Sequence, residues 1–154
     1  MDISVIIPAY NEEKRIAFTL EKSIEFLQQR PWQYELIPVD DGSQDATVAH
    51  IAEVACDYPQ VRCVLNGKNR GKGYSIRHGL GEAKGQFIGF MDADYKTDIT
   101  ALDHAMELLG NGACGVIGDR TLGGSEIARE RKLYREIGSN AFRRGLQMLT
   151  GLRG

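Results

Sequence analysis

Apolar residues follow two alternating spacings along the chain. Short runs rich in Ile, Val and Phe occupy residues 3–8, 34–40, 61–65, 86–91 and 114–118, and each run is typical of a buried strand. The segments between them carry apolar residues at helical spacing, as Ile16, Leu20, Ile24 and Leu27 do within residues 14–29. The same spacing predicts helices over residues 48–55, 76–83 and 99–109, and residues 127–149 are predicted to be helical and basic.

This alternation predicts an α/β fold with a mostly parallel sheet covered by helices on both faces. The strands are almost continuously apolar, which fits a sheet buried on both sides. The sequence contains no internal repeat or linker, so residues 1–154 are predicted to form one domain. Ligands bind outside the carboxyl ends of the strands in such sheets, so the residues that follow each strand are the candidates for a site.

Composition narrows the function classes. The 154 residues are 42% hydrophobic, and 19 basic residues against 21 acidic ones give a net charge of −2, which argues against a dedicated nucleic-acid binder. Cys56, Cys63 and Cys114 have no disulfide or zinc spacing and are predicted to be small core residues. With no leader pattern and no apolar run near the roughly 20 residues of a membrane span, the expected location is cytoplasmic.

Acidic residues gather after the first two strands. Tyr10 and Glu12 offer an aromatic face and a carboxylate to a nucleoside, or Glu12 simply begins the acidic first turn of a helix. Asp40, Asp41 and Asp45 follow the second strand, where Asp residues also stabilise turns and cap helices. We predict that Asp45 is structural and that at least one of Asp40 and Asp41 is functional.

The third strand is followed by a basic, glycine-rich loop at residues 66–73. Only three residues separate Gly67 from Gly71, so the loop is not a Walker-type phosphate loop, and Ile76 stands where a dinucleotide fingerprint needs glycine. What remains is a flexible cationic loop that opens a helix and suits an anion, or a solvated basic loop.

Asp92 and Asp94 are the sharpest signal in the sequence. They leave a buried strand at positions i and i+2, where two carboxylates can share one divalent cation. Because Mg²⁺ in proteins commonly uses one or two carboxylates plus substrate phosphates, the pair predicts a metal–diphosphate site. Arg120, after the fifth predicted strand, is a candidate partner for a phosphate or a site carboxylate, or forms a surface salt bridge.

In this order, the motifs at residues 5–12, 39–43, 71–73 and 92–94 resemble the family 2 glycosyltransferases, which have the GT-A fold. The stretch at 71–77 and the motif at 118–120 resemble one branch of that family. This branch contains dolichyl-phosphate glucosyltransferases, mannose synthases and their bacterial polyprenyl-phosphate relatives. The resemblance runs over nearly the whole chain.

The resemblance implies a role for each matching position. Asp92 and Asp94 would bind Mg²⁺ or Mn²⁺ that bridges the donor diphosphate, with Lys72 near the donor and Arg120 near the phosphates or sugar. The residues that would hold or pack against the nucleotide-sugar lie at three strand ends: Pro8, Ala9, Tyr10, Glu12, Val39, Asp41 and Ala93.

Lys96 departs from the family pattern. Mannose synthases of this type can carry a metal-binding Gln there, and a protonated lysine cannot ligate a metal. The Gly-Lys-Gly loop at 71–73 resembles the glucosyltransferases, so UDP-glucose ranks above GDP-mannose as the expected donor.

The expected activity is therefore a metal-dependent, inverting transfer of a hexose, with glucose favoured, to a polyprenyl or dolichyl phosphate. Two alternatives stay open: a nucleotide-sugar-binding fragment without turnover, and a family 2 enzyme that acts on a sugar hydroxyl. Relatives continue with acceptor-side segments, so the chain is expected to be truncated at its C-terminus. The basic and apolar residues of 127–149 predict a helix at the inner face of an anionic membrane, or a helix that packs on the core.

Overall fold

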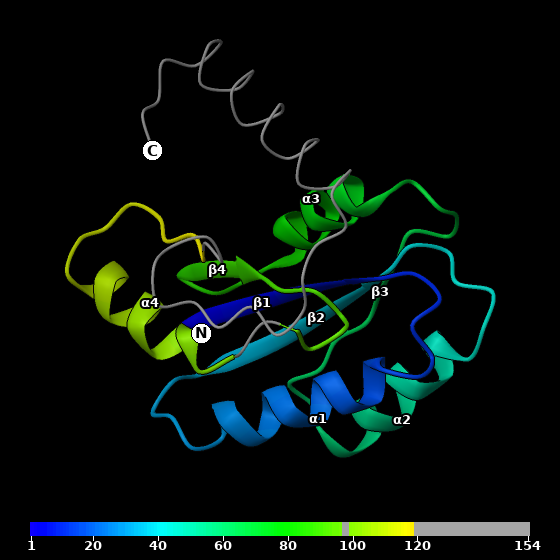
Figure 1. Ribbon diagram of the computed structural model, residues 1–154, viewed down its shortest axis with the longest axis horizontal. Coiled ribbons are helices and arrows are strands. Elements are labelled where there is room, and N and C mark those ends of the chain that lie inside the picture. The colour runs from blue at the N-terminus through cyan, green and yellow to red at the C-terminus, as the bar shows by residue number, and fades with distance from the viewer. Residues whose placement is uncertain (97–98, 119–154) are drawn as a thin grey trace, which may run out of the picture. The chain divides into compact units, whose positions relative to one another are not determined.

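The computed structural model describes residues 1–96 and 99–118 (Figure 1). Four strands and four helices alternate over these residues, as the spacing predicted. They are β1 (Ile3–Ala9), α1 (Ile16–Leu27), β2 (Tyr34–Asp40), α2 (Thr47–Asp57), β3 (Val64–Leu65), α3 (Lys72–Glu82), β4 (Phe87–Phe90) and α4 (Ala101–Gly110).

Residues Met1–Val116 form one compact unit. A second unit, Ile117–Gly154, has only Ile117 and Gly118 among the described residues. The single domain expected over residues 1–154 stays a prediction, and the basic segment 127–149 lies outside the described residues. Within the described part of the chain, no helix is long and apolar enough to cross a membrane.

The strands form a parallel sheet in the order β3-β2-β1-β4. β1 pairs with β2 from Ile3 opposite Tyr34 to Ala9 opposite Asp40, and with β4 from Ile3 opposite Phe87. The carboxyl ends of β1, β2 and β4 therefore meet at one edge, which confirms the predicted sheet and brings the polar strand ends together.

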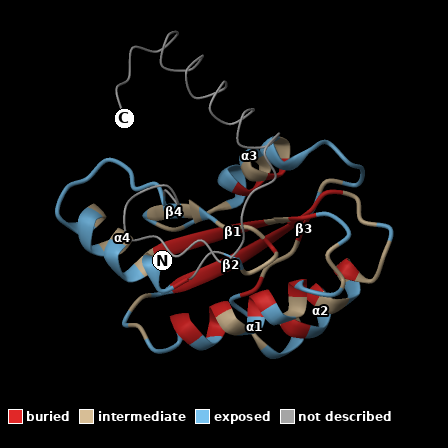
Figure 2. Cartoon of the chain, viewed as in Figure 1, coloured by how far each residue is buried: buried red, intermediate tan, exposed pale blue. Residues whose placement is uncertain are grey.

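Alternate residues of β1 face opposite sides of this sheet. Ile3, Val5 and Ile7 belong to a large buried cluster with residues of α1 and α2, whereas Ile6 packs in a second cluster with Ile37 of β2. Helix α3 covers the second face, so helices lie on both sides of the sheet, as predicted (Figures 1 and 2).

Helix α3 packs through small residues instead of the apolar residues that its pattern suggested. Its buried residues are Ser75 and Gly79, while Leu80 is exposed. A Cβ atom on Gly79 would stand 2.6 Å from the Ile6 side chain, so glycine lets the helix approach the sheet closely.

Two strand predictions need correction. Residues 114–118 form no strand among the described residues, and Ile117 is 91% exposed, because no neighbouring strand offers them a hydrogen-bonding partner. The strand predicted over 61–65 is limited to Val64–Leu65, with Val61 joined to Leu36 by an isolated bridge.

The cysteines are not the core residues that we expected. Cys56 and Cys114 are exposed. Cys56 follows the buried Val54 by two residues, which places it about 200° round the helix from the core. Cys63 is half-buried, and burial raises the pKa of its thiol to about 11.

Candidate active site

A cleft of about 230 Å³ opens at the carboxyl ends of β1, β2 and β4. It gathers all the predicted site residues except Val39 and Arg120. Its lining residues are Pro8, Ala9, Tyr10, Glu12, Asp41, Lys72, Ser75, Asp92, Ala93 and Asp94. The site proposed from separate strand ends is thus one surface of the folded chain, and the roles assigned to these residues stay predictions.

Three residues differ from the predicted set. Val39 is fully buried in the core beside Ile6 and Ile37 and does not line the cleft, because the side chains packed around it cover it. Arg120 lies outside the described residues. Ser75 was not predicted. It is a buried polar residue in the first turn of α3, and a search for apolar residues at helical spacing does not detect such a position.

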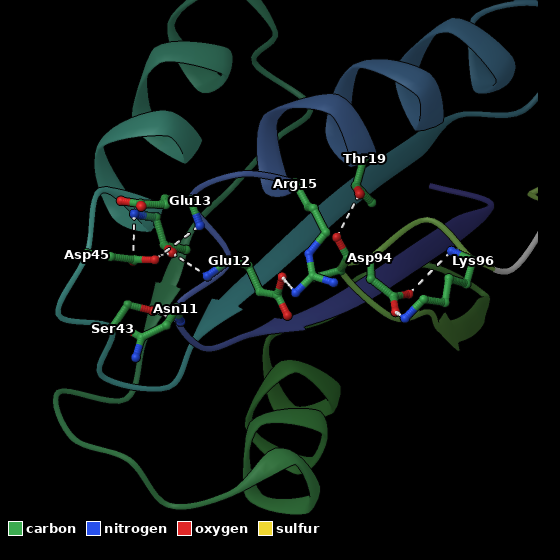
Figure 3. A network of polar contacts seen from close by, with 11 residues as sticks. Asn11, Glu12, Glu13, Arg15, Thr19, Ser43, Asp45, Asp94 and Lys96 are labelled. Atoms are coloured by element: carbon green, nitrogen blue, oxygen red, sulfur yellow. Dashed lines mark hydrogen bonds and ion pairs between the residues drawn. The ribbon is translucent and has the colours of Figure 1, made fainter. Parts of the chain in front are cut away.

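Hydrogen bonds join the loops that follow β1 and β2, as the one between Glu13 and Asp45 does in Figure 3. The Asn11 backbone N–H donates to Ser43 Oγ at 2.9 Å, and the Gln44 N–H donates to Asn11 Oδ1 at 2.9 Å. Asn11 adopts a left-handed backbone with φ of 54°, which asparagine tolerates better than most residues. These two hydrogen bonds fix Asn11 and thereby position its neighbours Tyr10 and Glu12, which line the cleft.

Asp45 and Asp40 serve structural purposes, as the prediction for Asp45 anticipated. Asp45 accepts hydrogen bonds from the backbone N–H groups of Glu13 at 3.1 Å and Thr47 at 3.0 Å. Burial alone would raise the pKa of Asp45, but these bonds and the Thr47 hydroxyl hold it below its usual value. Asp40 accepts from the Gly42 N–H at 3.0 Å within its own turn. Asp41 is therefore the acid of this strand end that faces the cleft.

Asp41 holds the basic loop in place. Its side chain is buried, and Oδ1 accepts from Asn66 Nδ2 at 2.7 Å and from the Arg70 N–H at 2.9 Å, while Oδ2 accepts from the Gly71 N–H at 2.7 Å. Burial opposes ionisation, but these hydrogen bonds together hold the pKa of Asp41 below its usual range. The loop amides that suit an anion thus already bind a carboxylate of the protein, and of the loop's cations only Lys72 lines the cleft.

The turn that carries the two acids is anchored from α1. The buried Thr19 hydroxyl donates to the Ala93 carbonyl at 2.7 Å (Figure 3). The Met91 N–H donates to the Ile6 carbonyl at 3.0 Å. Ala93 is itself buried, so Asp92 and Asp94 stand on either side of a fixed point.

Each of these two carboxylates is paired with its own lysine. Lys72 Nζ binds Asp92 Oδ1, and Lys96 Nζ binds Asp94 Oδ2 while the Lys96 N–H reaches Asp94 Oδ1 at 3.3 Å. Tyr95, which lies between Asp94 and Lys96, adopts a left-handed backbone with φ of 50° and closes the turn. Burial would raise the pKa of Asp94, but Lys96 outweighs it and the pKa lies below its usual value.

The donor set fits a divalent cation held partly by substrate. Asp92 and Asp94 supply hard carboxylate oxygens to one cleft, and over residues 1–96 and 99–118 no three His, Cys, Asp or Glu side chains gather as a metal site. A cation such as Mg²⁺ is commonly bound by one or two carboxylates and completed by phosphate oxygens and water. Lys96, which we predicted not to ligate the metal, pairs with Asp94.

Comparison with solved structures defines the class of protein. The crystal structure of S. aureus TarS 1-349 in complex with UDP-GlcNAc aligns at 30% identity with a TM-score of 0.59, covering 72% of this chain and 32% of that one. The mannosyltransferase PcManGT from Pyrobaculum calidifontis, in complex with GDP-Man and Mn²⁺, aligns at 26% identity with a TM-score of 0.56, covering 70% and 32%. The fold is that of the GT-A glycosyltransferases, as the ordered motifs implied.

The family follows from the sequence match. The model of glycosyl transferase family 2 matches residues 4–152, and the chain belongs to this family. Dolichyl-phosphate beta-glucosyltransferase ALG5D of Trichomonas vaginalis is 36% identical over 145 residues, covering 88% of this chain and 44% of its own length. The Drosophila melanogaster dolichyl-phosphate beta-glucosyltransferase is 40% identical over 114 residues, covering 67% and 34%. The chain thus spans less than half the length of these relatives.

Proposed function

We propose that this chain carries the donor site of a metal-dependent, inverting glycosyltransferase. The enzyme would move a hexose, with glucose favoured, from a nucleotide-sugar to a polyprenyl or dolichyl phosphate. The observation that supports this proposal most directly is the cleft itself, where Asp92 and Asp94 stand opposite the helix that presents Lys72. A cleft with paired carboxylates and a lysine ammonium group suits a metal-bound diphosphate.

The described residues divide the work of donor binding. Tyr10 is 44% exposed beside the end of β1 and offers a ring against which a base can stack. Asp41 also lines the cleft and fixes the loop before α3 by accepting from the Gly71 N–H. Asp92 and Asp94 would hold Mg²⁺ or Mn²⁺, which when bound stabilises negative charge on a departing diphosphate. Lys72 adds positive charge at the same place.

The preferred donor is UDP-glucose, with GDP-mannose second. The relatives named above are dolichyl-phosphate beta-glucosyltransferases, which supports glucose as the sugar and a lipid phosphate as the acceptor. An acceptor phosphate is largely ionised near neutral pH, so its oxygen is already a charged nucleophile and needs no strong general base. Such an acceptor would also bring the protein to the cytoplasmic face of a membrane.

A second candidate is nucleotide-sugar binding without transfer. It is favoured by the lining of the cleft, which except for Ser75 consists of residues predicted to bind the donor or its metal.

Calorimetry of nucleotide binding tests the donor site. UDP-glucose and GDP-mannose are titrated with and without Mg²⁺ into the wild-type chain and into Asp94→Ala, with Asp57→Ala on the exposed end of α2 as the control. We expect Mg²⁺ to strengthen binding in the wild type and control but not in Asp94→Ala. Equal binding by all three chains, with or without Mg²⁺, would falsify the metal assignment.

A transfer assay separates the two candidates. Each donor is incubated with Mg²⁺ and polyprenyl phosphate, and lipid-linked sugar is measured. Formation of glucosyl lipid supports the transferase function. Donor binding without product supports the second candidate, nucleotide-sugar binding without transfer.

A further inference from the structure

We propose that Lys72 and Lys96 are resident counter-ions of the acidic pair, which a divalent cation displaces, and that only Lys72 then moves to the donor diphosphate. The proposal rests on the proposed function, since it concerns the same cleft. It assigns the two lysines different roles: Lys72 links cation binding to nucleotide binding, and Lys96 weakens the binding of a cation that arrives alone.

The first observation is that the pairing is one to one. Lys72 binds one oxygen of Asp92, and Lys96 binds both oxygens of Asp94, through its ammonium group and its backbone N–H. The two lysines therefore occupy three of the four carboxylate oxygens of the acidic pair, all except Asp92 Oδ2. A cation at these oxygens would stand against two ammonium groups, and their repulsion favours the departure of both lysines.

The second observation is that both pairs can open at low cost. The side chains of Lys72 and Lys96 are 54% and 59% exposed, and exposed ion pairs contribute little net stability. Neither ammonium group has another carboxylate within an ion-pair distance among the described residues. A doubly charged cation therefore competes well for these carboxylates, while the lysines return to them when it leaves.

The third observation distinguishes the lysines. Lys72 is the first residue of α3 and lines the cleft, with Nζ 5.9 Å from the centre of the Phe90 ring. Lys96 follows Asp94 on a turn closed by the left-handed Tyr95 and does not line the cleft. Of these two lysines, only Lys72 lines the cleft in which a diphosphate would bind. Nucleotide binding therefore compensates for the loss of only one of the two ion pairs.

Lysine side-chain NMR tests the exchange directly. The ammonium signals of a ¹⁵N-lysine-labelled chain are assigned by their loss in Lys72→Met, Lys96→Met and Lys22→Met. Lys22 is the control because it pairs with Glu25 on the surface of α1. Mg²⁺ should shift the signals of Lys72 and Lys96 but not that of Lys22. Addition of UDP to the Mg²⁺-loaded chain should shift Lys72 again and leave Lys96 unchanged.

Affinities of the same variants give an independent readout. Without nucleotide, Lys72→Met and Lys96→Met should each bind Mn²⁺ about fivefold more tightly than the wild type. In these variants the cation no longer has to break a lysine–carboxylate ion pair, and two unit charges about 4 Å apart in water attract each other by an energy that corresponds to about this factor. At saturating Mg²⁺, Lys72→Met should bind UDP about fivefold more weakly, whereas Lys96→Met should bind it as the wild type does. Lys22→Met should change neither affinity.

The outcomes keep this proposal separate from the proposed function. If Mg²⁺ strengthens UDP binding in an Asp94-dependent way but leaves both lysine signals in place, the exchange is overturned and the donor site stands. If UDP shifts Lys96 as strongly as Lys72, the division of roles is overturned. If Mg²⁺ has no effect on UDP binding in any chain, the proposed donor site fails and the exchange fails with it.

Discussion

At the scale of single residues, Asp41 shows how one side chain can serve the site without occupying its centre. Three hydrogen bonds from a loop 25 to 30 residues further along the chain converge on its carboxylate. The buried carboxylate is charged because those donors compensate for its burial. Its position therefore governs where the loop ends and where Lys72 begins α3.

Replacing Asp41 by Asn should destabilise the chain by about 1–3 kcal/mol. The amide retains one acceptor oxygen but turns an NH₂ group toward the Gly71 N–H, which leaves a buried donor without an acceptor. Urea unfolding monitored by circular dichroism measures the change, and Asp57→Asn on the exposed end of α2 is the control. An Asp41→Asn chain as stable as the control would contradict this account.

The same carboxylate should contribute to acid unfolding. The pKa of Asp41 is lowered in the folded chain, so its stabilisation is fully present above the unfolded value near 3.9 and is lost as pH falls through the folded value. Wild-type stability should therefore fall as pH is lowered from about 5 to 2, and Asp41→Asn should show a shallower fall. Urea midpoints across this range test the prediction, which parallel pH profiles would contradict.

At the scale of elements, the site depends on contacts between helices and strands that are distant in sequence. Helix α1 holds the acidic turn through Thr19, which is 74 residues from Ala93. Helix α3 lies close to the sheet because Gly79 meets Ile6 without a side chain. Both contacts set where Asp92 and Lys72 stand relative to each other.

Substituting Thr19 by Val should weaken Mg²⁺-dependent UDP binding and destabilise the fold by about 1–3 kcal/mol. Valine keeps the volume but leaves the buried Ala93 carbonyl without the donor that fixes the turn. Calorimetry and thermal unfolding measure the two effects. Thr19→Ser retains the hydroxyl and should bind UDP nearly as the wild type does; equal losses in both variants would show that packing, not the hydrogen bond, positions the turn.

Helix α3 offers a matched pair of glycines. Gly79→Ala should cost about 1–3 kcal/mol because its Cβ would meet the Ile6 side chain at 2.6 Å. Gly81→Ala, in the same helix with no atom within 4 Å of the added Cβ, should be neutral or stabilise by up to about 1 kcal/mol. Thermal unfolding of both variants checks the close approach, which an equally stable Gly79→Ala would rule out.

At the scale of the whole molecule, charge is separated along the chain despite a net charge of only −2. Acids stand at the strand ends, and the sequence gathers six basic residues between 129 and 144, outside the described residues. A basic segment with interleaved apolar residues suits an anionic membrane surface, the setting in which a lipid phosphate acceptor would be met.

The chain should therefore co-sediment with anionic vesicles better than with neutral ones, and less so at high salt, because salt screens surface charge. Arg143→Glu combined with Arg144→Glu should reduce this binding. Lys14→Glu combined with Lys22→Glu, at the other end of the chain, should reduce it less. Equal sedimentation with both kinds of vesicle would remove the membrane contact.

The alternation of strands and helices, the family and most of the cleft could be predicted from the order of the amino acids. This was possible because strand periodicity is local, and because parallel strands bring their carboxyl ends to one edge. Asp92 and Asp94 are two residues apart, so the sequence alone predicts that their carboxylates lie close together.

The hydrogen-bonding and ion-pair partners of those residues, in contrast, are set by the folded arrangement of the elements. Asn66 and Gly71 reach Asp41 across the sheet edge, Thr19 reaches Ala93 from α1, and the buried face of α3 is set by the fit of Gly79 to Ile6. Such contacts depend on the distance between elements rather than on spacing along the chain, so no periodicity records them. The counter-ions of the acidic pair belong to the same group, since Lys72 and Asp92 meet only when α3 and β4 lie on one sheet.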